Sequence, residues 1–126
     1  MRLNLQTDYA LRLLMFIAQR DGQASVEEVA RTFGVSRHHL MKVAQQLAGL
    51  GLVEAKRGRG GGLVLARPAA SINVGAVVRA IEPTGHFVEC FDRATNQCIL
   101  AGACGLQGAL GLALRDFLAR LDTFTL

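Results

Sequence analysis

The sequence predicts a mainly α-helical protein that contains one small β-hairpin and ends in a long helix. Apolar residues recur at helical spacing over most of the chain, and a glycine-rich basic run separates two short apolar segments near the middle. The length of 126 residues suits a single hydrophobic core with one further element for assembly. We therefore interpret the chain as one functional unit.

The first helix is expected from about Thr7 to Gln19, with Thr7 or Asp8 as its N-cap. Its apolar residues fall on one helical face: Ala10, Leu11, Leu14, Ile17 and Ala18. The dipeptide Asp21-Gly22 ends this pattern, because glycine after aspartate is typical of a turn.

Two short helices follow, joined by a turn at Gly34. Ser25 and Glu28 have the spacing of a capping box at the start of the first, and Ser36 can cap the second. Helical spacing predicts that their buried faces consist of Val26, Val29, Ala30 and Phe33, and of Leu40, Val43, Ala44 and Leu47. Two short helices joined by a glycine turn predict a helix-turn-helix.

A β-hairpin is expected directly after these helices. Residues 52–56 and 63–66 are predicted to form strands on either side of Gly58-Arg59-Gly60-Gly61-Gly62. A hairpin with a basic, flexible tip after a helix-turn-helix defines a winged helix. A further helix is expected from Asn73 to a stop before Pro83.

The last helix is expected from Leu106 to Leu121 and is apolar on two sides. We expect one side to pack on its own domain and the other on a second subunit, and a deeply buried core helix is the alternative. The chain then divides into a winged helix-turn-helix domain at 1–83, a cysteine loop at 84–104 and a dimerisation helix at 105–126.

Positive charge is concentrated in the middle of the chain. The formal net charge is +4, yet residues 31–67 alone carry seven Lys or Arg residues against the single acid Glu54, a local charge of +6. Such a segment is typical of a surface that binds a phosphate backbone, although a solvated basic face is the bland alternative.

The sequence also predicts a cytoplasmic protein. Hydrophobic residues make up 51% of the chain, but charged residues interrupt every apolar stretch before the roughly 18 residues that a membrane span needs. The start, Met1-Arg2-Leu3-Asn4, shows no signal-peptide pattern, so we expect neither secretion nor a membrane partner.

In a helix-turn-helix, the N-terminal turn of the second helix approaches the base edges of double-stranded DNA. The candidate DNA-binding residues there are Ser36, Arg37, His38, His39, Lys42 and Gln45. Arginine can bond two guanine acceptors, and histidine can donate to a base or a phosphate. In the hairpin, Lys56, Arg57 and Arg59 lie among glycines that permit close approach to a phosphate or a minor groove. A nucleotide-cradling loop is the weaker alternative, because no Gly-Lys-Ser/Thr ending follows.

Three cysteines, Cys90, Cys98 and Cys104, lie in the cysteine loop. A reducing cytoplasm disfavours disulfides, and three is an odd number for pairing. Grouped thiolates suit a soft metal or an iron–sulfur cluster, whereas the spacing is not the paired C-x2-C of a zinc site. Ordinary buried cysteines or a thiol switch are the alternatives.

A four-iron cluster needs one ligand per iron, so three cysteines leave one position open. The open position could take water, a residue of a partner chain, or one of Asp8, His86, Glu89 and Asp92. An oxygen ligand binds iron less strongly than a thiolate would, which suits the sensing of a small diatomic molecule.

Four motifs carry a resemblance that covers essentially the entire chain: Thr7–Arg12, Val35–Val43, Arg57–Gly62 and Gly85–Phe91. With the cysteine spacing, they make the chain resemble the winged-helix regulator family that includes IscR, and especially its branch of NsrR-type nitric-oxide-sensing iron–sulfur repressors. Gly85-His86-Phe87-Val88-Glu89-Cys90-Phe91 and the cysteine spacing are the most specific features of that branch.

The resemblance implies a homodimer that binds a [4Fe-4S] cluster through Cys90, Cys98 and Cys104, with Asp8 reaching over from the other subunit as the fourth ligand. It further implies that nitric oxide attacks the cluster and that the recognition helices then leave operators of nitric-oxide-detoxification genes. The implied protein is a transcriptional repressor and not an enzyme. Gly105, Gly108 and Gly111 depart from the expected pattern, because they weaken the start of the last helix.

Two other functions stay open at this point. One is a [2Fe-2S] or thiol-based transcription regulator that responds to redox state or iron supply, which an iron-to-sulfide count would separate. The other is an electron-transfer or thiol-redox protein in which the helix-turn-helix is incidental. That protein would lack sequence-selective DNA binding, whereas a repressor should show it with a steep salt dependence.

Overall fold

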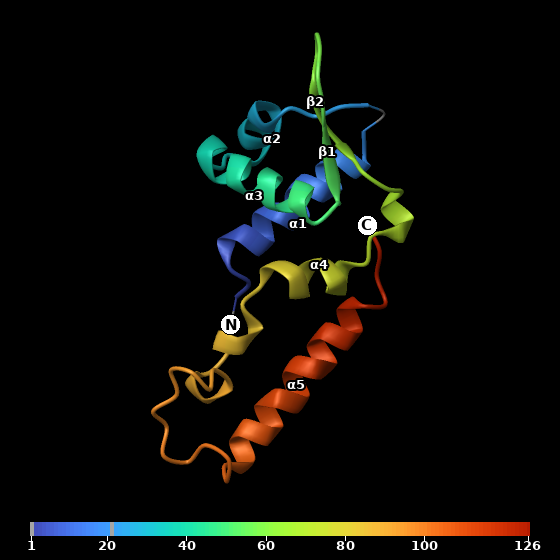
Figure 1. Ribbon diagram of the computed structural model, residues 1–126. Coiled ribbons are helices and arrows are strands. Elements are labelled where there is room, and N and C mark those ends of the chain that lie inside the picture. The colour runs from blue at the N-terminus through green and yellow to red at the C-terminus, as the bar shows by residue number, and fades with distance from the viewer. Residues whose placement is uncertain (1, 21) are drawn as a thin grey trace.

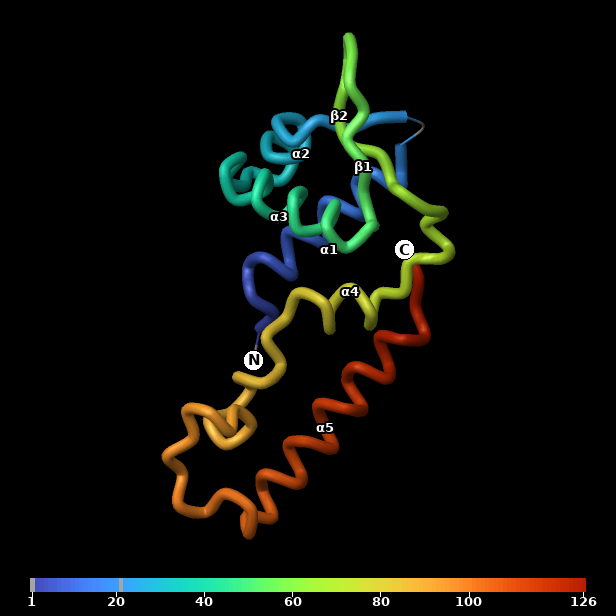
Figure 2. The backbone as a smooth tube through the Cα atoms, in the orientation of Figure 1, coloured from blue at the N-terminus to red at the C-terminus, as the bar shows by residue number. Residues whose placement is uncertain are grey.

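The helix-turn-helix, the hairpin and the long last helix are all present in the computed structural model, which describes residues 2–20 and 22–126. The helices are α1 (Leu5–Ala18), α2 (Val26–Phe33), α3 (Arg37–Gly49), α4 (Val74–Ile81) and α5 (Gly105–Leu121), and the strands are β1 (Val53–Lys56) and β2 (Gly62–Leu65). Figure 1 shows the hairpin at one end of the molecule and the cysteine loop at the other. Helix α5 runs from that loop back to α4 (Figure 2).

Helix α1 starts earlier than the sequence predicted. Thr7 and Asp8 are not its N-cap; instead Asn4 Oδ1 accepts a hydrogen bond of 2.7 Å from the backbone N–H of Thr7. Asn4 is itself a strong capping residue, and its own N–H donates to the Glu82 carboxylate at 3.1 and 3.3 Å. Asp21 of the predicted break lies outside the described residues, while Gly22 has a positive φ of 125°.

The helix-turn-helix has the predicted caps. Ser25 Oγ accepts from the N–H of Glu28 at 3.1 Å, and Ser36 Oγ accepts from the N–H of His39 at 3.4 Å. Gly34 ends α2 in the left-handed conformation, with φ 63°. The predicted core residues of α3 are all buried: Leu40, Val43, Ala44 and Leu47.

The predicted hairpin is confirmed, with strand boundaries that differ by one residue. The strands are antiparallel, with Val53 opposite Leu65 and Lys56 opposite Gly62. Ala24, just before α2, pairs with Leu63 of β2 through two backbone hydrogen bonds of 2.8 and 3.0 Å. A Cβ on Gly62 would lie 2.7 Å from the carbonyl oxygen of Ala24, so the close approach requires glycine. The hairpin is therefore joined to the helix-turn-helix.

Helix α4 follows its predicted cap, since Asn73 Oδ1 accepts from the N–H of Ala76 at 2.8 Å. The cysteine loop contains two short 3-10 turns, Thr84–His86 and Glu89–Phe91, which helical periodicity did not predict because each is only one turn long. Across the described chain, no helix combines the length and apolarity needed to cross a lipid bilayer.

The core lies where α1 packs against α3, α4 and β2. Its largest fully buried apolar side chains are Leu13, Leu14, Leu40, Leu47, Ile72, Val29, Val43 and Val78. Helix α5 contributes little to this core, because Leu118 is its one buried residue. The alternative of a deeply buried last helix therefore does not hold within a single chain.

Candidate functional site

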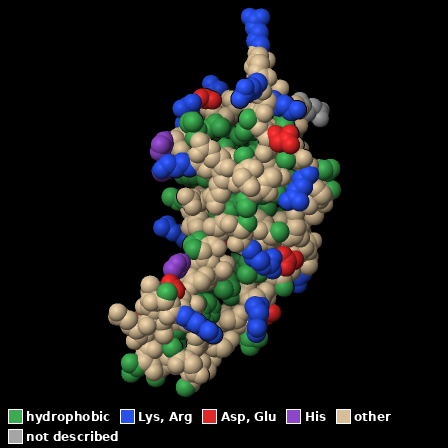
Figure 3. Space-filling view, in the orientation of Figure 1, with side chains coloured by type: hydrophobic (Ala, Val, Ile, Leu, Met, Phe, Trp, Pro, Cys, Tyr) green, Lys and Arg blue, Asp and Glu red, His purple; other side chains and the backbone are tan. Residues whose placement is uncertain are grey.

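The predicted DNA-binding residues form an exposed surface on α3 and the hairpin, which we call the recognition surface. All of its residues are exposed: Ser36, Arg37, His38, His39, Lys42, Gln45, Lys56, Arg57 and Arg59. Ser36 also has a structural role as the N-cap of α3. Figure 3 shows Lys and Arg side chains at the tip of the projecting hairpin.

The candidate DNA-binding residues of α3 lie on different faces of the helix. Each helical residue turns by about 100°, so the buried face fixes where the other side chains lie. His38, Lys42 and Gln45 lie opposite the buried face, whereas Arg37 and His39 lie on its two flanks. Residues on the opposite face are best placed to enter a groove of DNA, and the flanking residues are placed at its edges.

The two flanks of α3 border different grooves. On one side, a groove of about 270 Å³ is lined by His39 and Lys42 together with Leu5 and Tyr9 of α1. On the other, a groove of about 270 Å³ lies between α2, α3 and the hairpin, and Arg37 and Lys56 line it. Arg37 therefore lies between the recognition helix and the wing.

Glu27 of α2 contacts the recognition surface and was not predicted from the sequence. The Arg37 Nε–H donates to Glu27 Oε1 at 2.5 Å. A hydrogen bond with its own backbone and the bond from Arg37 lower the pKa of Glu27, which keeps it ionised. The two residues are ten positions apart on different helices, so no local pattern reveals the pair.

The three cysteines are free and half-buried. Among the residues that the structure describes, no three His, Cys, Asp or Glu side chains gather into a group that could hold a metal ion. The structure thus places the thiols on one loop without converging them. Cys104 is the N-cap residue of α5, and its side chain makes no capping hydrogen bond.

Gln107, which was not predicted from the sequence, joins two parts of the cysteine loop. Its Oε1 accepts from the N–H of Gly102 at 3.0 Å, and its Nε2 donates to the carbonyl of Cys90 at 3.1 Å. The loop backbone around Cys90 is therefore fastened to the first turn of α5. A long amide side chain one turn after Cys104 is the only signal for this contact in the sequence.

The acidic residues of the loop are engaged in holding its backbone. Glu89 Oε1 accepts from the N–H of Gln97 at 2.7 Å. Asp92 accepts from Thr95 Oγ1 at 2.8 Å and from the N–H of Ala94 at 2.9 Å, and these bonds lower the pKa of Asp92. His86 Nδ1 lies 3.5 Å from Asp92 Oδ2.

Asp8 is not grouped with the cysteines of its own chain. Its carboxylate accepts from Arg12 Nε at 3.0 Å and lies 2.8 Å from Arg12 Nη2, with 37% of the aspartate side chain exposed. Arg12 also lies over the ring of Phe33, 5.8 Å from its centroid. Both contacts hold the side chains in fixed directions on the surface of α1.

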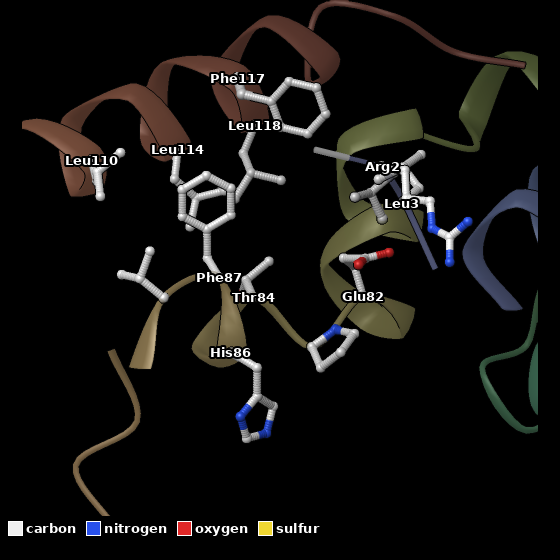
Figure 4. Close-up of a pocket in the computed structure, with 13 residues that line it drawn as sticks. Arg2, Leu3, Glu82, Thr84, His86, Phe87, Leu110, Leu114, Phe117 and Leu118 are labelled. Atoms are coloured by element: carbon white, nitrogen blue, oxygen red, sulfur yellow. The ribbon is translucent and has the colours of Figure 1, made fainter. Parts of the chain in front are cut away.

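An apolar cavity of about 630 Å³ lies between α5 and the start of the cysteine loop. Its lining includes Leu110, Leu114 and Phe117 of α5. Figure 4 shows Phe87 pointing toward α5, while His86 points away from the cavity. On the rest of α5, Leu106 and Leu112 are 65% and 54% exposed. This helix therefore presents apolar surface that its own chain does not cover.

The other end of α5 is fixed firmly to α4. Arg79 Nη1 and Nη2 donate to the two carboxylate oxygens of Asp122 at 2.5 Å each, and Asn73 Nδ2 donates to the Asp122 carbonyl at 2.7 Å. A Cβ on Gly75 would collide with Asp122 Oδ1 and come within 2.9 Å of the Asp122 backbone nitrogen. Helix α5 is thus anchored at its C-terminal end.

The chain is similar to known transcriptional regulators. The family model Rrf2, described as iron-dependent transcriptional regulator, matches residues 3–126. The HTH-type transcriptional regulator NsrR of Bacillus subtilis (strain 168) is 46% identical over 100% of this chain and 88% of that protein. NsrR of Halalkalibacterium halodurans is 44% identical with the same coverage.

Solved structures show the same fold. The structure of CymR, the global cysteine regulator of B. subtilis, has a TM-score of 0.76 at 25% identity and covers 99% of this chain and 92% of that one. IscR of T. potens has a TM-score of 0.76 at 23% identity, covering 99% and 82%. The predicted winged-helix fold is therefore confirmed.

Proposed function

Because this chain belongs to the Rrf2 family of iron-dependent transcriptional regulators, we propose that it is a dimeric repressor that senses nitric oxide through an iron–sulfur cluster. It binds operator DNA through the recognition surface while the cluster is intact, and it leaves the operator when nitric oxide attacks the cluster. Residues 1–83 act as the DNA-binding domain, 84–104 as the sensing loop and 105–126 as the dimerisation helix. The protein acts in the cytoplasm, where operator DNA lies.

One observation carries this proposal: the hairpin of the exposed recognition surface and a loop with three free thiols lie at opposite ends of the molecule, and α5 runs from that loop back to α4 (Figure 1). The first suits DNA, because its basic and amide side chains are donors of the length that base edges and phosphates require. The second suits a regulatory input, because it lies away from the recognition surface.

The donor set fits an iron–sulfur cluster. Cys90, Cys98 and Cys104 are unpaired thiols, and thiolates are the usual protein ligands of such clusters. We propose that these three residues hold a [4Fe-4S] cluster, which would supply iron atoms that react with nitric oxide. A [2Fe-2S] cluster is the alternative. The scattered placement of the thiols in the single chain is consistent with a loop that takes its final shape around an inorganic template.

We propose Asp8 of the second subunit as the fourth ligand. The family resemblance supports this assignment, and Glu89 and Asp92 already accept hydrogen bonds from the loop backbone. The contact with Arg12 fixes the direction of the Asp8 carboxylate, whose oxygens retain further lone pairs. This assignment requires the homodimer, since no such grouping exists among the described residues of one chain.

The uncovered face of α5 supports the homodimer. Leu106 and Leu112 are exposed, and the cavity beside Leu110 and Leu114 is apolar. Burying such surface against a second copy is favourable by about 25 cal/mol per Å². A pair of α5 helices would then set the distance between two recognition surfaces, which must match half-sites roughly 34 Å apart.

A path of contacts links the loop to the recognition surface. Gln107 ties the loop to the first turn of α5, and Asp122 ties the last turn to α4. Helix α4 packs on α1, and α1 packs on α3. A change of loop shape on cluster loss would therefore be transmitted through α5 and α4 to the recognition surface of each subunit.

The test is anaerobic purification of the full chain, with iron and sulfide analysis and absorption spectra before and after nitric oxide. DNA binding is measured in parallel with duplexes selected from a random-sequence pool. We expect a four-iron cluster and selective binding that falls steeply with salt and is lost after nitric oxide. Two irons per cluster would favour the [2Fe-2S] alternative, no iron would favour a thiol-based regulator, and no selected sequence would favour a redox protein.

Cys98→Ala is expected to abolish nitric-oxide-responsive release, seen as the loss of any difference in operator binding with and without nitric oxide, because removing one thiolate leaves no intact cluster for nitric oxide to attack. The measurement is operator binding with and without nitric oxide, together with circular dichroism to show that the variant is folded. Normal release by a folded variant would contradict the cluster mechanism.

Asp8→Ala is expected to alter the absorption spectrum of the cluster and its reaction with nitric oxide. Arg12→Ala is the matched control, because it breaks the same ion pair and keeps the carboxylate. If Asp8→Ala leaves both properties unchanged, Asp8 is not a ligand, and the repressor proposal itself is unaffected.

A further inference from the structure

Glu27 and Arg37 form an ion pair at the edge of the recognition surface. It links α2 to the first residue of the recognition helix, and both side chains are more than half exposed, at 56% and 58%. An exposed ion pair contributes little to stability. Its position at the edge of the recognition surface indicates a different role.

The helix dipoles of α2 and α3 favour this contact for both residues. Glu27 lies in the first turn of α2, where the helix dipole favours a carboxylate. Arg37 lies at the N-terminus of α3, where the dipole disfavours a cation. The Glu27 carboxylate offsets that repulsion and gives the guanidinium one preferred direction.

The contact leaves the useful end of the arginine available. Glu27 accepts from Nε, and the described part of the chain supplies no acceptor to either Nη atom. Those two nitrogens can still bond to a pair of acceptors such as guanine O6 and N7. The pair lines the groove between α2, α3 and the hairpin, beside Lys56 and the base of the wing.

We propose that Glu27 is a positioning residue for sequence recognition: it orients the Arg37 guanidinium so that its Nη groups face a base pair at the edge of the operator contact. This inference rests on the proposed DNA-binding function. Holding the side chain in place before binding reduces the rotamer entropy that would otherwise be lost on binding DNA.

The test compares the sequence preferences of variants. Anaerobically prepared full-length wild type, Glu27→Ala, Glu27→Gln and Arg37→Ala are each used to select duplexes from a random-sequence DNA pool, which is then sequenced. Arg37→Ala should lose about fivefold or more of the discrimination at the base pair that it contacts. Glu27→Ala should lose roughly three- to tenfold at that same base pair and not elsewhere, and Glu27→Gln, which keeps an acceptor, should lose less.

Glu28→Ala is the matched control. Glu28 is the neighbouring acid in the same turn, but it pairs with Arg20 and not with Arg37. The Glu28→Ala substitution removes the same charge as Glu27→Ala and should leave the selected DNA sequence unchanged. In an Arg37→Ala background, Glu27→Ala should have no further effect on preference.

Two results would overturn the proposal. One is a Glu27→Ala protein that selects the wild-type sequence with wild-type strength while binding all duplexes more tightly, which would mean that Glu27 only repels phosphates. The other is a loss of preference at base pairs that Arg37→Ala does not affect. A wild-type protein that selects no sequence would instead refute the DNA-binding function, and the inference would fall with it.

Discussion

Helices α1 to α4 and the hairpin contain almost all the buried side chains of the described chain, whereas the segment from residue 84 onward buries only Leu118. The N-terminal region has a core in which Leu13, Leu14, Leu40 and Leu47 are almost completely excluded from water. In the C-terminal region, Ile99 and Leu106 are 96% and 65% exposed. The first region therefore carries its own stabilising core, whereas the second leaves much of its apolar surface exposed.

Helix capping shows the same contrast. Asn4, Ser25, Ser36 and Asn73 each cap their helix with a side-chain hydrogen bond. Cys104, at the start of α5, makes none. A thiol proposed for ligation thus occupies a position where a capping residue would add about 1 kcal/mol. The region that would sense the signal is less stable where it would respond.

Truncation of leucines in the two regions should give the largest difference. Leu13→Ala should lower the free energy of unfolding by about 2–5 kcal/mol, because it leaves a cavity in a fully buried site. Leu112→Ala should cost less than about 1 kcal/mol in urea unfolding, because its side chain is 54% exposed, and should weaken self-association in sedimentation. Equal losses of unfolding free energy in the two variants, with unchanged self-association, would contradict the difference in burial between the two regions.

Glycine substitutions test the two ends of α5. Gly75→Ala should destabilise by about 1–3 kcal/mol, because its Cβ would collide with Asp122 and cannot be accommodated without a backbone shift. Gly108→Ala meets nothing within 4 Å and should stabilise α5 by up to about 1 kcal/mol. Thermal unfolding measures both. A loss of stability in Gly108→Ala would show that a second chain packs closely on that part of α5.

The smallest expected effect concerns pH. The hydrogen bond from Arg79 lowers the pKa of Asp122 below its usual value of 3.8, so its contribution is present above that pH and is lost as the pH falls through the lowered pKa. Asp122→Asn should therefore lower the melting temperature at pH 7, and the gap to wild type should close below about pH 3.8. A gap that stays constant down to pH 2 would mean that the ion pair does not contribute to the anchor.

Local patterns predict the helices of both regions: the predicted last helix is Leu106–Leu121 and α5 spans Gly105–Leu121. Ser25, Gly34 and Ser36 act on their own helices, so local patterns reveal them. The predicted start of α1 at Thr7 is too late, because Asn4 caps the helix. Contacts between distant residues, such as Glu27 with Arg37 and Gln107 with Cys90, have no local signature.

For the cysteine loop, the sequence predicts a chemistry but no geometry. Its residue types indicate soft-metal ligation, yet its backbone has no period and its side chains do not converge in one chain. The shape of such a segment depends on what binds it. Asp8 illustrates the same point. The resemblance makes it a ligand to the cluster of the second subunit, and no pattern within one chain shows how the two subunits are placed.

The pairing of Ala24 with Leu63 has a consequence for how an operator is released. Its two backbone hydrogen bonds join the wing to the segment just before α2, so the wing and the helix-turn-helix are held together. If a signal travels along α5 as proposed, it would shift the wing and the helix-turn-helix together. An isolated half-site would then be bound alike before and after the signal, and only the spacing between two half-sites would change.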